Sequence, residues 1–259
     1  MIFEVLQKFL IAMVIFIPLE RMLPMHDHKI FRKGWKTDLS YALGVTLLTG
    51  VGMIVTIAFS IMVIEPLIPT SFKEWIASLP LALQVLAIIV IADIGYYWIH
   101  RMHHEIPYLW NFHAVHHSIE KMDWLAAHRV HPLDQILTRG VSLVLPYSMG
   151  FTSTALAVWA FIFMWHSLLK HSNVKIPLGP LRWIVASPVY HHWHHANIRS
   201  AFDKNYAGQL PILDIIFGTA IMDRDPPDKY GTDHAVSDNV ARQIMDPIVN
   251  YQPDPKPEE

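Results

Sequence analysis

The amino-acid sequence predicts an all-α integral membrane protein, a bundle of about four helices with a cytosolic helical cap that holds a histidine-rich site. Three observations support this fold class. Hydrophobic residues make up 53% of the 259 positions and charged residues only 16%, whereas an ordinary soluble domain has about 25% charged residues. Four stretches of the chain are apolar enough to enter a bilayer. Histidine occurs 17 times, and cysteine is absent.

The same composition excludes several classes of protein. Without cysteine, the chain has no disulfide framework, thiolate zinc site, iron–sulfur cluster or thiol nucleophile. The formal net charge of −2 gives no indication of nucleic-acid binding. The high hydrophobic content is also incompatible with a largely disordered chain.

The first two apolar stretches come before residue 65. Residues 9–19 form the weaker one, and Glu20 and Arg21 follow it in place of a small-residue cleavage site, so we interpret it as an anchor. Residues 39–64 contain no charge in 26 positions, which exceeds the roughly 20 apolar residues that a membrane-spanning helix needs. These residues predict an anchor followed by a membrane span.

The other two apolar stretches lie farther along the chain. Residues 79–99 carry a single charge, at Asp93, and predict another spanning helix. Residues 136–169 contain Arg139 and a break at 146–153, and they are short for two full passes. We therefore expect a tilted hairpin or a re-entrant pair there.

The distribution of basic residues predicts the orientation in the membrane. Between the first two apolar stretches the chain carries five basic side chains, namely Arg21, Lys29, Arg32, Lys33 and Lys36. The next connection, 65–78, carries only Lys73 beside two glutamates. Because cytoplasmic loops are enriched in lysine and arginine, we expect 21–38 in the cytoplasm and 65–78 outside. The chain from His100 onward then lies on the cytoplasmic side.

The histidines are concentrated in one part of the chain, because 14 of the 17 lie between positions 100 and 195. Eight of them form one H-x3-H and two H-x2-H-H patterns, with helical spacing: His100 and His104, then His113, His116 and His117, then His191, His194 and His195. So many imidazoles on one side of a membrane would be costly to charge together. Metal ions avoid that cost because they bind neutral imidazole.

The residue types narrow the choice of metal. Imidazole suits zinc, copper, iron and nickel. The string that begins His104-Glu105 lacks the second histidine of the H-E-x-x-H motif of zinc proteases, and the Glu-x-x-His motifs of soluble carboxylate di-iron bundles are missing. Eight histidines exceed the ligands of one zinc ion, so two metals are the more economical interpretation. Two irons can bind and activate O2.

The order of these motifs resembles a known family. The run from Asp93 through His100 and His104 to Ser118 resembles the signature of the fatty acid hydroxylase / sterol desaturase superfamily. Later segments also resemble that family's motifs, namely Arg129-Val-His131-Pro132-Leu-Asp134, His171-Ser172-Asn173, Ser187-Pro188 with the last histidine pattern, Asp203-Lys204-Asn205-Tyr206-Ala207 and Phe217-Gly218-Thr219. The resemblance covers roughly residues 90–220.

This resemblance implies a membrane oxidoreductase with two iron ions that uses O2 and two electrons to hydroxylate or desaturate a lipid C–H bond. An ether-lipid-cleaving monooxygenase of the same family is the alternative within it. The implied metal ligands are His100, His104, His113, His116, His117, His131, His171, His191, His194 and His195. Zinc can replace iron in a purified sample. His166 and the other neighbouring histidines do not fall on the motif positions.

Two polar residues are candidates to support the ligands. Asp93 lies seven residues, about two helical turns, before His100, and a carboxylate deep in an apolar helix is expensive. We expect it to accept a hydrogen bond from a ligand imidazole and so to fix its tautomer. Asn205 is expected to support a ligand in the same way.

The resemblance also divides the chain into parts. Residues 1–90 are expected to be membrane anchor helices, and 91–220 a catalytic domain that includes the membrane hairpin near 136–169. Residues 221–259 are a polar C-terminal tail, whose end at 253–259 is expected to be disordered.

Two further expectations concern partners and alternatives. Because no haem, dinucleotide or ferredoxin-type motif is present, electrons must come from an external donor protein or reductant. A histidine-rich membrane metal transporter or metal-binding protein is a competing hypothesis from another class. Its ligands are expected near the middle of the bilayer on broken helices, whereas the histidines here fall at helix ends and in polar segments.

Overall fold

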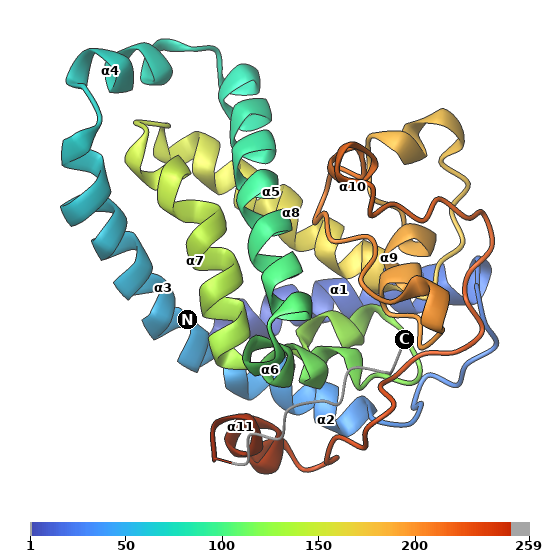
Figure 1. Ribbon diagram of the computed structural model, residues 1–259. Helices are drawn as coiled ribbons and strands as arrows, with labels where there is room; N and C mark the ends of the chain where they lie inside the picture. Colours follow the sequence, from blue (N-terminus) through green and yellow to red (C-terminus); the bar gives the residue numbers. More distant parts are fainter. Residues whose placement is uncertain (1, 250–259) are drawn as a thin grey trace.

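The computed structural model describes residues 2–249, so the predicted disordered end at 253–259 lies outside the described residues. Within that range the chain forms eleven α-helices, several short 3₁₀ or π turns and no strand, which confirms the all-α prediction (Figure 1). The α-helices are α1 (Ile2–Met22), α2 (Trp35–Ser40), α3 (Thr46–Phe59), α4 (Thr70–Ser78), α5 (Leu81–Glu105), α6 (Pro107–His117), α7 (Pro132–Ser148), α8 (Ser153–His171), α9 (Pro188–His194), α10 (Ile212–Phe217) and α11 (Val240–Val249). The shorter turns are η1 (Tyr41–Val45), η2 (Ser60–Ile64), η3 (Glu65–Leu67), η4 (Trp124–His128), η5 (Gly179–Trp183) and η6 (Arg199–Ala201).

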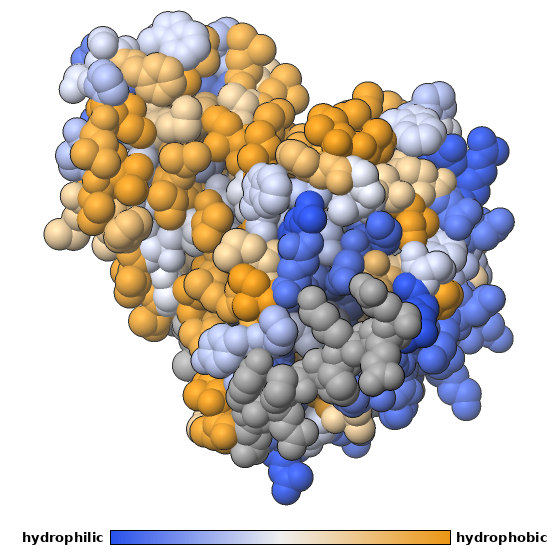
Figure 2. All heavy atoms as spheres, in the orientation of Figure 1, coloured by the Kyte–Doolittle hydropathy of each residue, from blue (hydrophilic) through white to orange (hydrophobic). Residues whose placement is uncertain are grey.

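Three segments among the described residues are helical, long and apolar enough to cross a membrane: Thr49–Leu67, Leu81–Glu105 and Ser153–His171. They expose large apolar side chains, such as Ile54, Leu86 and Phe161, which would be unfavourable in water. Figure 2 shows hydrophobic side chains gathered over the α3, α5 and α7 side, with hydrophilic ones over the opposite side of the view. The chain is therefore an integral membrane protein.

The segment 136–169 consists of α7 and α8, joined by the short turn 149–152. The helix α7 has 17 residues, fewer than the roughly 20 that a full crossing requires. It packs against both α3 and α5, while α8 packs against α5. A Cβ at Gly95 would lie 3.1 Å from the backbone of α7 at Val141 and Ser142. Glycine therefore lets α5 and α7 approach closely, as small residues do between membrane helices.

The long helix α5 links the membrane bundle to the cap. Its 25 residues span about 37 Å at 1.5 Å per residue, which exceeds a hydrocarbon core of about 30 Å. The last turns, with His100 and His104, therefore extend to the edge of the bundle. The helix ends because Ile106 precedes Pro107 and adopts extended backbone angles, and α6 begins at the proline.

The cap, which includes α6, α9 and α11, is assembled from segments far apart in the sequence. The helix α9 begins at Pro188, and the Ser187 hydroxyl accepts the N–H of Tyr190 at 3.0 Å, a favourable N-cap. The helix α8 packs against α9, and α11 packs against α6. The cap thus lies at the end of the bundle opposite α4 (Figure 1), where α5, α6, α8 and α9 converge.

Candidate metal centre

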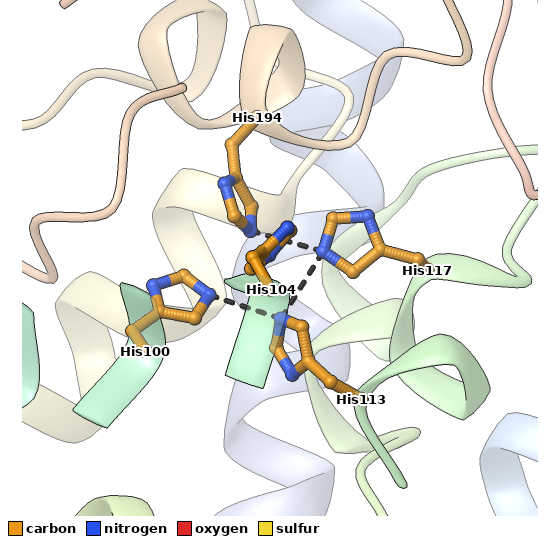
Figure 3. Close-up of side chains that lie close together, drawn as sticks. All are labelled: His100, His104, His113, His117 and His194. Atoms are coloured by element: carbon orange, nitrogen blue, oxygen red, sulfur yellow. Dashed lines mark hydrogen bonds between the residues drawn. The ribbon is translucent and has the colours of Figure 1, made fainter. Parts of the chain in front are cut away.

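Nine histidines form two compact clusters at the junction of the bundle and the cap. The first contains five histidines: His100, His104, His113, His117 and His194. The second contains four histidines: His116, His171, His191 and His195. Within each cluster, one ring nitrogen per residue lies within 4.8 Å of all the others. Figure 3 shows the five imidazoles of the first cluster converging.

Helical periodicity distributes each H-x2-H-H pattern between the two clusters. On α6, His113 and His117 are one turn apart and face the first cluster, while His116 faces the second. At the end of α9, His194 joins the first cluster, whereas His191 and His195 join the second. Residues four apart share a helix face and their neighbour points elsewhere, so one H-x2-H-H pattern serves both clusters.

In the five-histidine cluster the Nε2 atoms are close to one another. Nε2 of His113 lies 3.0 Å from Nε2 of His100 and 3.1 Å from that of His117. Nε2 of His117 lies 3.0 Å from that of His194. Metal–nitrogen bonds of about 2.1 Å at right angles place neighbouring nitrogens about 3.0 Å apart. These separations therefore fit ligand atoms around one metal ion.

The four-histidine cluster has the same arrangement. Nε2 of His171 lies 3.1 Å from Nε2 of His116 and 2.9 Å from that of His191. Nε2 of His195 lies 3.2 Å from that of His191. The second cluster therefore also fits the donor atoms of one metal ion.

The opposite ring nitrogens fix the tautomers. Nδ1–H donates to a backbone carbonyl in four of the clustered histidines: His100 to Tyr206 at 2.7 Å, His194 to Lys204 at 2.9 Å, His116 to Arg129 at 2.8 Å and His171 to Ser167 at 2.7 Å. In His113, Nδ1–H donates to the Asp134 carboxylate at 2.8 Å. A neutral imidazole whose Nδ1 is protonated keeps a lone pair on Nε2, so these lone pairs point into the clusters.

These lone pairs face one another in two pairs of residues. The Nε2 atoms of His100 and His113 are 3.0 Å apart, and those of His116 and His171 are 3.1 Å apart, yet in each pair both are acceptors. Nε2 of His104 is buried without a hydrogen-bond partner. Facing acceptors repel each other, and an unpaired buried polar atom is costly. A cation in each cluster would remove both penalties, so the residues fit metal ions.

Burial favours the neutral form of the clustered imidazoles that lie outside the membrane-spanning helices. It lowers the pKa of His116 to about 4. Burial also lowers, well below the ordinary value, the pKa of the other clustered histidines that lie outside the membrane-spanning helices, namely His113, His117, His191, His194 and His195. Neutral imidazole is the form that binds metal, so these ligands are ready to bind at neutral pH.

His131, expected from its motif to be a ligand, lies outside both clusters. Its Nδ1 accepts the N–H of Leu133 at 3.1 Å and so caps α7. Its Nε2 donates to the carbonyl of Ile244 in α11 at 3.0 Å. Both ring nitrogens therefore have hydrogen-bond partners within the protein. His166, left outside the motif positions, contacts the Ala186 carbonyl at 2.7 Å through Nε2.

Replacing His131 with alanine should therefore leave the metal content unchanged and lower only the stability. Loss of the helix cap and of the contact with α11 is expected to cost about 1–2 kcal/mol. Elemental analysis of the purified protein and thermal unfolding would measure the two effects separately. A loss of one metal ion per chain would restore His131 to the ligand set.

Asp93 does not donate to or accept from a clustered imidazole, which corrects the prediction made from its spacing. Its carboxylate accepts the backbone N–H groups of Gln209 at 2.9 Å and Leu210 at 2.7 Å. Lys170 donates to the carbonyl of Gly208 in the same loop at 3.2 Å. This loop begins at Tyr206, whose carbonyl accepts from His100. Asp93 thus supports His100 through the loop.

Asn205 also contacts backbone instead of an imidazole, contrary to the prediction. Its amide donates to the carbonyls of Tyr190 at 2.8 Å and Ile221 at 3.0 Å and accepts the N–H of Ile221 at 2.6 Å. It adopts a left-handed φ of 58°, a conformation that asparagine tolerates better than most residues. Asn205 therefore joins the end of α9's first turn to the segment that follows α10.

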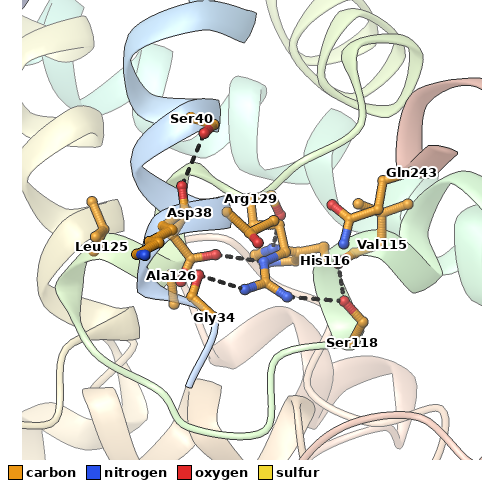
Figure 4. A network of polar contacts seen from close by, with 12 residues as sticks. Gly34, Asp38, Ser40, Val115, His116, Ser118, Leu125, Ala126, Arg129 and Gln243 are labelled. Atoms are coloured by element: carbon orange, nitrogen blue, oxygen red, sulfur yellow. Dashed lines mark hydrogen bonds and ion pairs between the residues drawn. The ribbon is translucent and has the colours of Figure 1, made fainter. Parts of the chain in front are cut away.

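Sequence reasoning gave no role to two residues that orient ligands. Asp134 accepts a hydrogen bond from His113. In the sequence it stands out only as the last residue of the Arg129–Asp134 motif, and its place in the first turn of α7 is the signal that could indicate this role. The backbone carbonyl of Arg129 accepts from His116, while its guanidinium contacts Asp38, Gly34 and Ser118 (Figure 4). Because every residue has a backbone carbonyl, the residue type does not indicate this role.

Comparison with known proteins adds independent evidence. The profile of the fatty acid hydroxylase family matches residues 85–219. The chain is 30% identical to ornithine lipid hydroxylase OlsE of Rhizobium tropici over 241 residues, which cover 87% of this chain and 69% of that protein. It is 37% identical to alkylglycerol monooxygenase of Homo sapiens over 145 residues, 56% of this chain and 32% of that protein. No solved structure gives a significant match.

A third relative is methylsterol monooxygenase 1 of Gallus gallus, with 30% identity over 157 residues, 59% of this chain and 51% of that protein. The chain therefore spans about a third of the human alkylglycerol monooxygenase and half of the sterol enzyme. The matched region contains the helices α5 to α9 that carry both histidine clusters.

Proposed function

Because this chain belongs to the fatty acid hydroxylase family of oxidoreductases, we propose that it is a membrane oxygenase that uses two iron ions and O2 to oxidise a C–H bond of a lipid. One observation carries the proposal: two adjacent clusters of neutral, inward-facing imidazoles lie at the end of the membrane bundle. Imidazole ligands suit iron, although zinc, copper and nickel bind them too.

The proposed ligand set follows the two clusters. His100, His104, His113, His117 and His194 would hold one iron, and His116, His171, His191 and His195 the other. When bound, the two irons would supply the activation of O2 with electrons from an external donor. The backbone carbonyls that accept from Nδ1 hold each imidazole in the tautomer that binds metal.

The position of the clusters indicates the physical form of the substrate. They lie at the C-terminal end of α5, which exposes Leu86, Val90 and Ile94 nearer its N-terminal end. A substrate with a long apolar part would partition into the membrane beside this helix and reach the clusters without crossing much water. We therefore propose a lipid substrate, and the polar cap would exclude bulk water from the metals.

The proposed orientation places the clusters on the cytoplasmic side. Lys29, Lys33 and Lys36 are exposed near α2, at the same end of the molecule as α6, and α4 lies at the opposite end (Figure 1). Basic residues favour the cytoplasmic side. The electron donor would then be a cytoplasmic or membrane-bound protein, or a diffusible reductant.

The alkylglycerol monooxygenase relatives favour a second candidate, oxidation of an ether lipid by the same metal centre. The metal-transporter hypothesis is less compatible with the geometry. Transport sites lie near the middle of the bilayer on broken helices. Here the histidines occupy the ends of α5 and α8 and the cap helices α6 and α9.

The proposed function predicts metal-dependent oxygen uptake. The full chain in lipid nanodiscs, loaded with Fe²⁺ and given a chemical reductant, should consume O2 when an ornithine lipid, an alkylglycerol or a sterol is supplied. Removal of iron with a chelator should abolish the uptake, and readdition should restore it. Mass spectrometry then distinguishes gain of one oxygen atom, loss of two hydrogens and release of an aldehyde.

Comparison of lipids from aerobic cells with and without the protein would identify the native substrate class. An unchanged lipid profile, together with metal uptake by vesicles and no oxygen consumption, would contradict the proposed function and favour transport.

A further inference from the structure

The carboxylate of Asp134 is the charged group closest to a clustered imidazole in hydrogen-bonding geometry. Its Oδ2 accepts from Nδ1 of His113 at 2.8 Å, and its Oδ1 accepts the hydroxyl of Thr138 at 3.0 Å. The side chain is only 3% exposed. Nε2 of His103 is 3.7 Å from Oδ1, beyond a hydrogen bond. Asp134 is therefore held by two partners and aimed at His113.

The two clusters differ in the groups that support their ligands. In the four-histidine cluster, Nδ1 of His116 and of His171 donates to backbone carbonyls. Nδ1 of His191 and of His195 is buried without a hydrogen-bond partner. Within the described residues, these ligands thus have no carboxylate at hydrogen-bond distance.

The five-histidine cluster has two carboxylates beside it. Asp134 contacts His113, and Oδ1 of Asp203 lies 3.5 Å from Nδ1 of His104. Asp203 is 61% exposed, whereas Asp134 is buried. A charge in a low-dielectric interior acts more strongly on a cation than one screened by water. A carboxylate behind a ligand imidazole also makes it a stronger donor to a metal.

We propose that the two clusters are loaded in a fixed order, the five-histidine cluster first, and that Asp134 sets this order through His113. The inference rests on the proposed function only in requiring that both clusters bind metal. The five-histidine cluster has one more ligand and the buried negative charge, so it binds a divalent cation more tightly. Asp134 is a positioning residue, since it touches the ligand and no reacting atom.

The test is a metal titration of the full chain in detergent. After removal of bound metal, the protein is titrated with Co²⁺ and, separately, with Zn²⁺ against a coloured chelator. The wild type should bind two equivalents in two steps. Asp134→Asn should weaken the tighter step by about 10- to 100-fold, the range for loss of such a partner, and change the weaker step much less, because Asp134 forms no hydrogen bond with that cluster.

Three further variants separate charge from structure. Asp134→Glu keeps the charge and should restore part of the affinity of the tighter step. Asp203→Asn is the matched control, a carboxylate near the same cluster but exposed, and should change that step by less than about 5-fold. If Asp134→Asn fails to fold, Thr138→Val keeps the carboxylate and removes one of its partners, and it should weaken the tighter step slightly.

Three results of these titrations would contradict the inference. A single step for two equal sites in the wild type would overturn it, and so would an equal shift of both steps in Asp134→Asn. A shift of only the weaker step in Asp134→Asn or Thr138→Val would overturn it as well. A wild type that binds no metal would instead contradict the proposed function, which keeps the two failures distinct.

Discussion

Replacing His100 with alanine is expected to empty the five-histidine cluster and to lower lipid oxidation by on the order of 100-fold or more. His100 is 2% exposed, and its Nε2 lies 3.0 Å from that of His113. Alanine removes one ligand and leaves a buried space beside His104 and His194. We expect bound iron to fall from two ions per chain to one, as measured by elemental analysis alongside the oxygen uptake.

His131→Ala is the matched control, because it also removes an imidazole from a motif position but from outside the clusters. It should keep two irons and most of the oxygen uptake. A His100→Ala protein with both irons and full turnover would show that the cluster is not the reaction centre. A fall in both variants to the same degree would point to general unfolding.

Two of the membrane spans could be predicted from the position of uncharged runs in the sequence. The run without charge at 39–64 covers most of the span Thr49–Leu67, and the run at 79–99 covers most of α5. Both follow from the exclusion of unpaired charges from lipid. The family resemblance is confirmed by the match over 85–219. The exact end of α5 depended on Pro107, which was also visible in the sequence.

The clustering of the histidines could also be predicted, since the eight histidines of the spaced patterns and His171 all lie in the two clusters. The division of these histidines between the two clusters could not be predicted. Helical spacing tells which residues share a face, but the orientation of α6 relative to α5 and α9 decides which cluster each face meets. That orientation depends on packing between segments far apart in the chain.

The differences between expectation and structure at Asp93, Asn205 and His131 have one physical cause. Each side chain finds its partners in backbone groups of a distant segment: Asp93 in 209–210, Asn205 in Tyr190 and Ile221, and His131 in Ile244. Backbone N–H and carbonyl groups occur at nearly every residue and must be paired when buried. A sequence therefore gives no sign of which of them will meet a given side chain.

Charged side chains also find partners that the sequence does not indicate, as Arg32 shows. It was counted among the basic residues that indicate the cytoplasmic side, yet it is 5% exposed. It donates to Asp38 at 2.6 Å and also contacts Asp123. Asp38 is fully buried and contacts Arg129 as well. The charges of this segment are therefore partly structural, and only its exposed basic side chains, Arg21, Lys29, Lys33 and Lys36, support the orientation.

Replacing Asp38 with alanine is expected to destabilise the protein by about 3–5 kcal/mol, the range for removing one partner of a buried ion pair. The carboxylate lies between two guanidiniums, those of Arg32 and Arg129. Figure 4 shows its contact with Arg129. Its loss leaves two buried positive charges with less compensation. For a chain of this size we expect the melting temperature in detergent to fall by roughly 10 °C.

The substitution Asp38→Ala should also weaken metal binding by the four-histidine cluster. Arg129 donates to the Gly34 carbonyl at 3.1 Å and to Ser118 at 3.3 Å, and its own carbonyl accepts from His116 at 2.8 Å. Without Asp38 the guanidinium loses its main anchor, so the carbonyl that orients His116 is less fixed. We therefore expect the affinity of that cluster for metal to fall by about 10-fold, with the five-histidine cluster less affected.

The control for Asp38→Ala is Glu120→Ala, which also removes a carboxylate from an ion pair. Glu120 contacts Lys33 at 2.8 Å, but the two side chains are 55% and 63% exposed, and such pairs contribute about 0–1 kcal/mol. Its melting temperature and metal affinity should stay near the wild-type values. If both variants lost equal stability, burial would not be what makes the Arg32–Asp38–Arg129 network important. If Asp38→Ala melted early yet bound metal normally, the network would stabilise the cap without orienting His116.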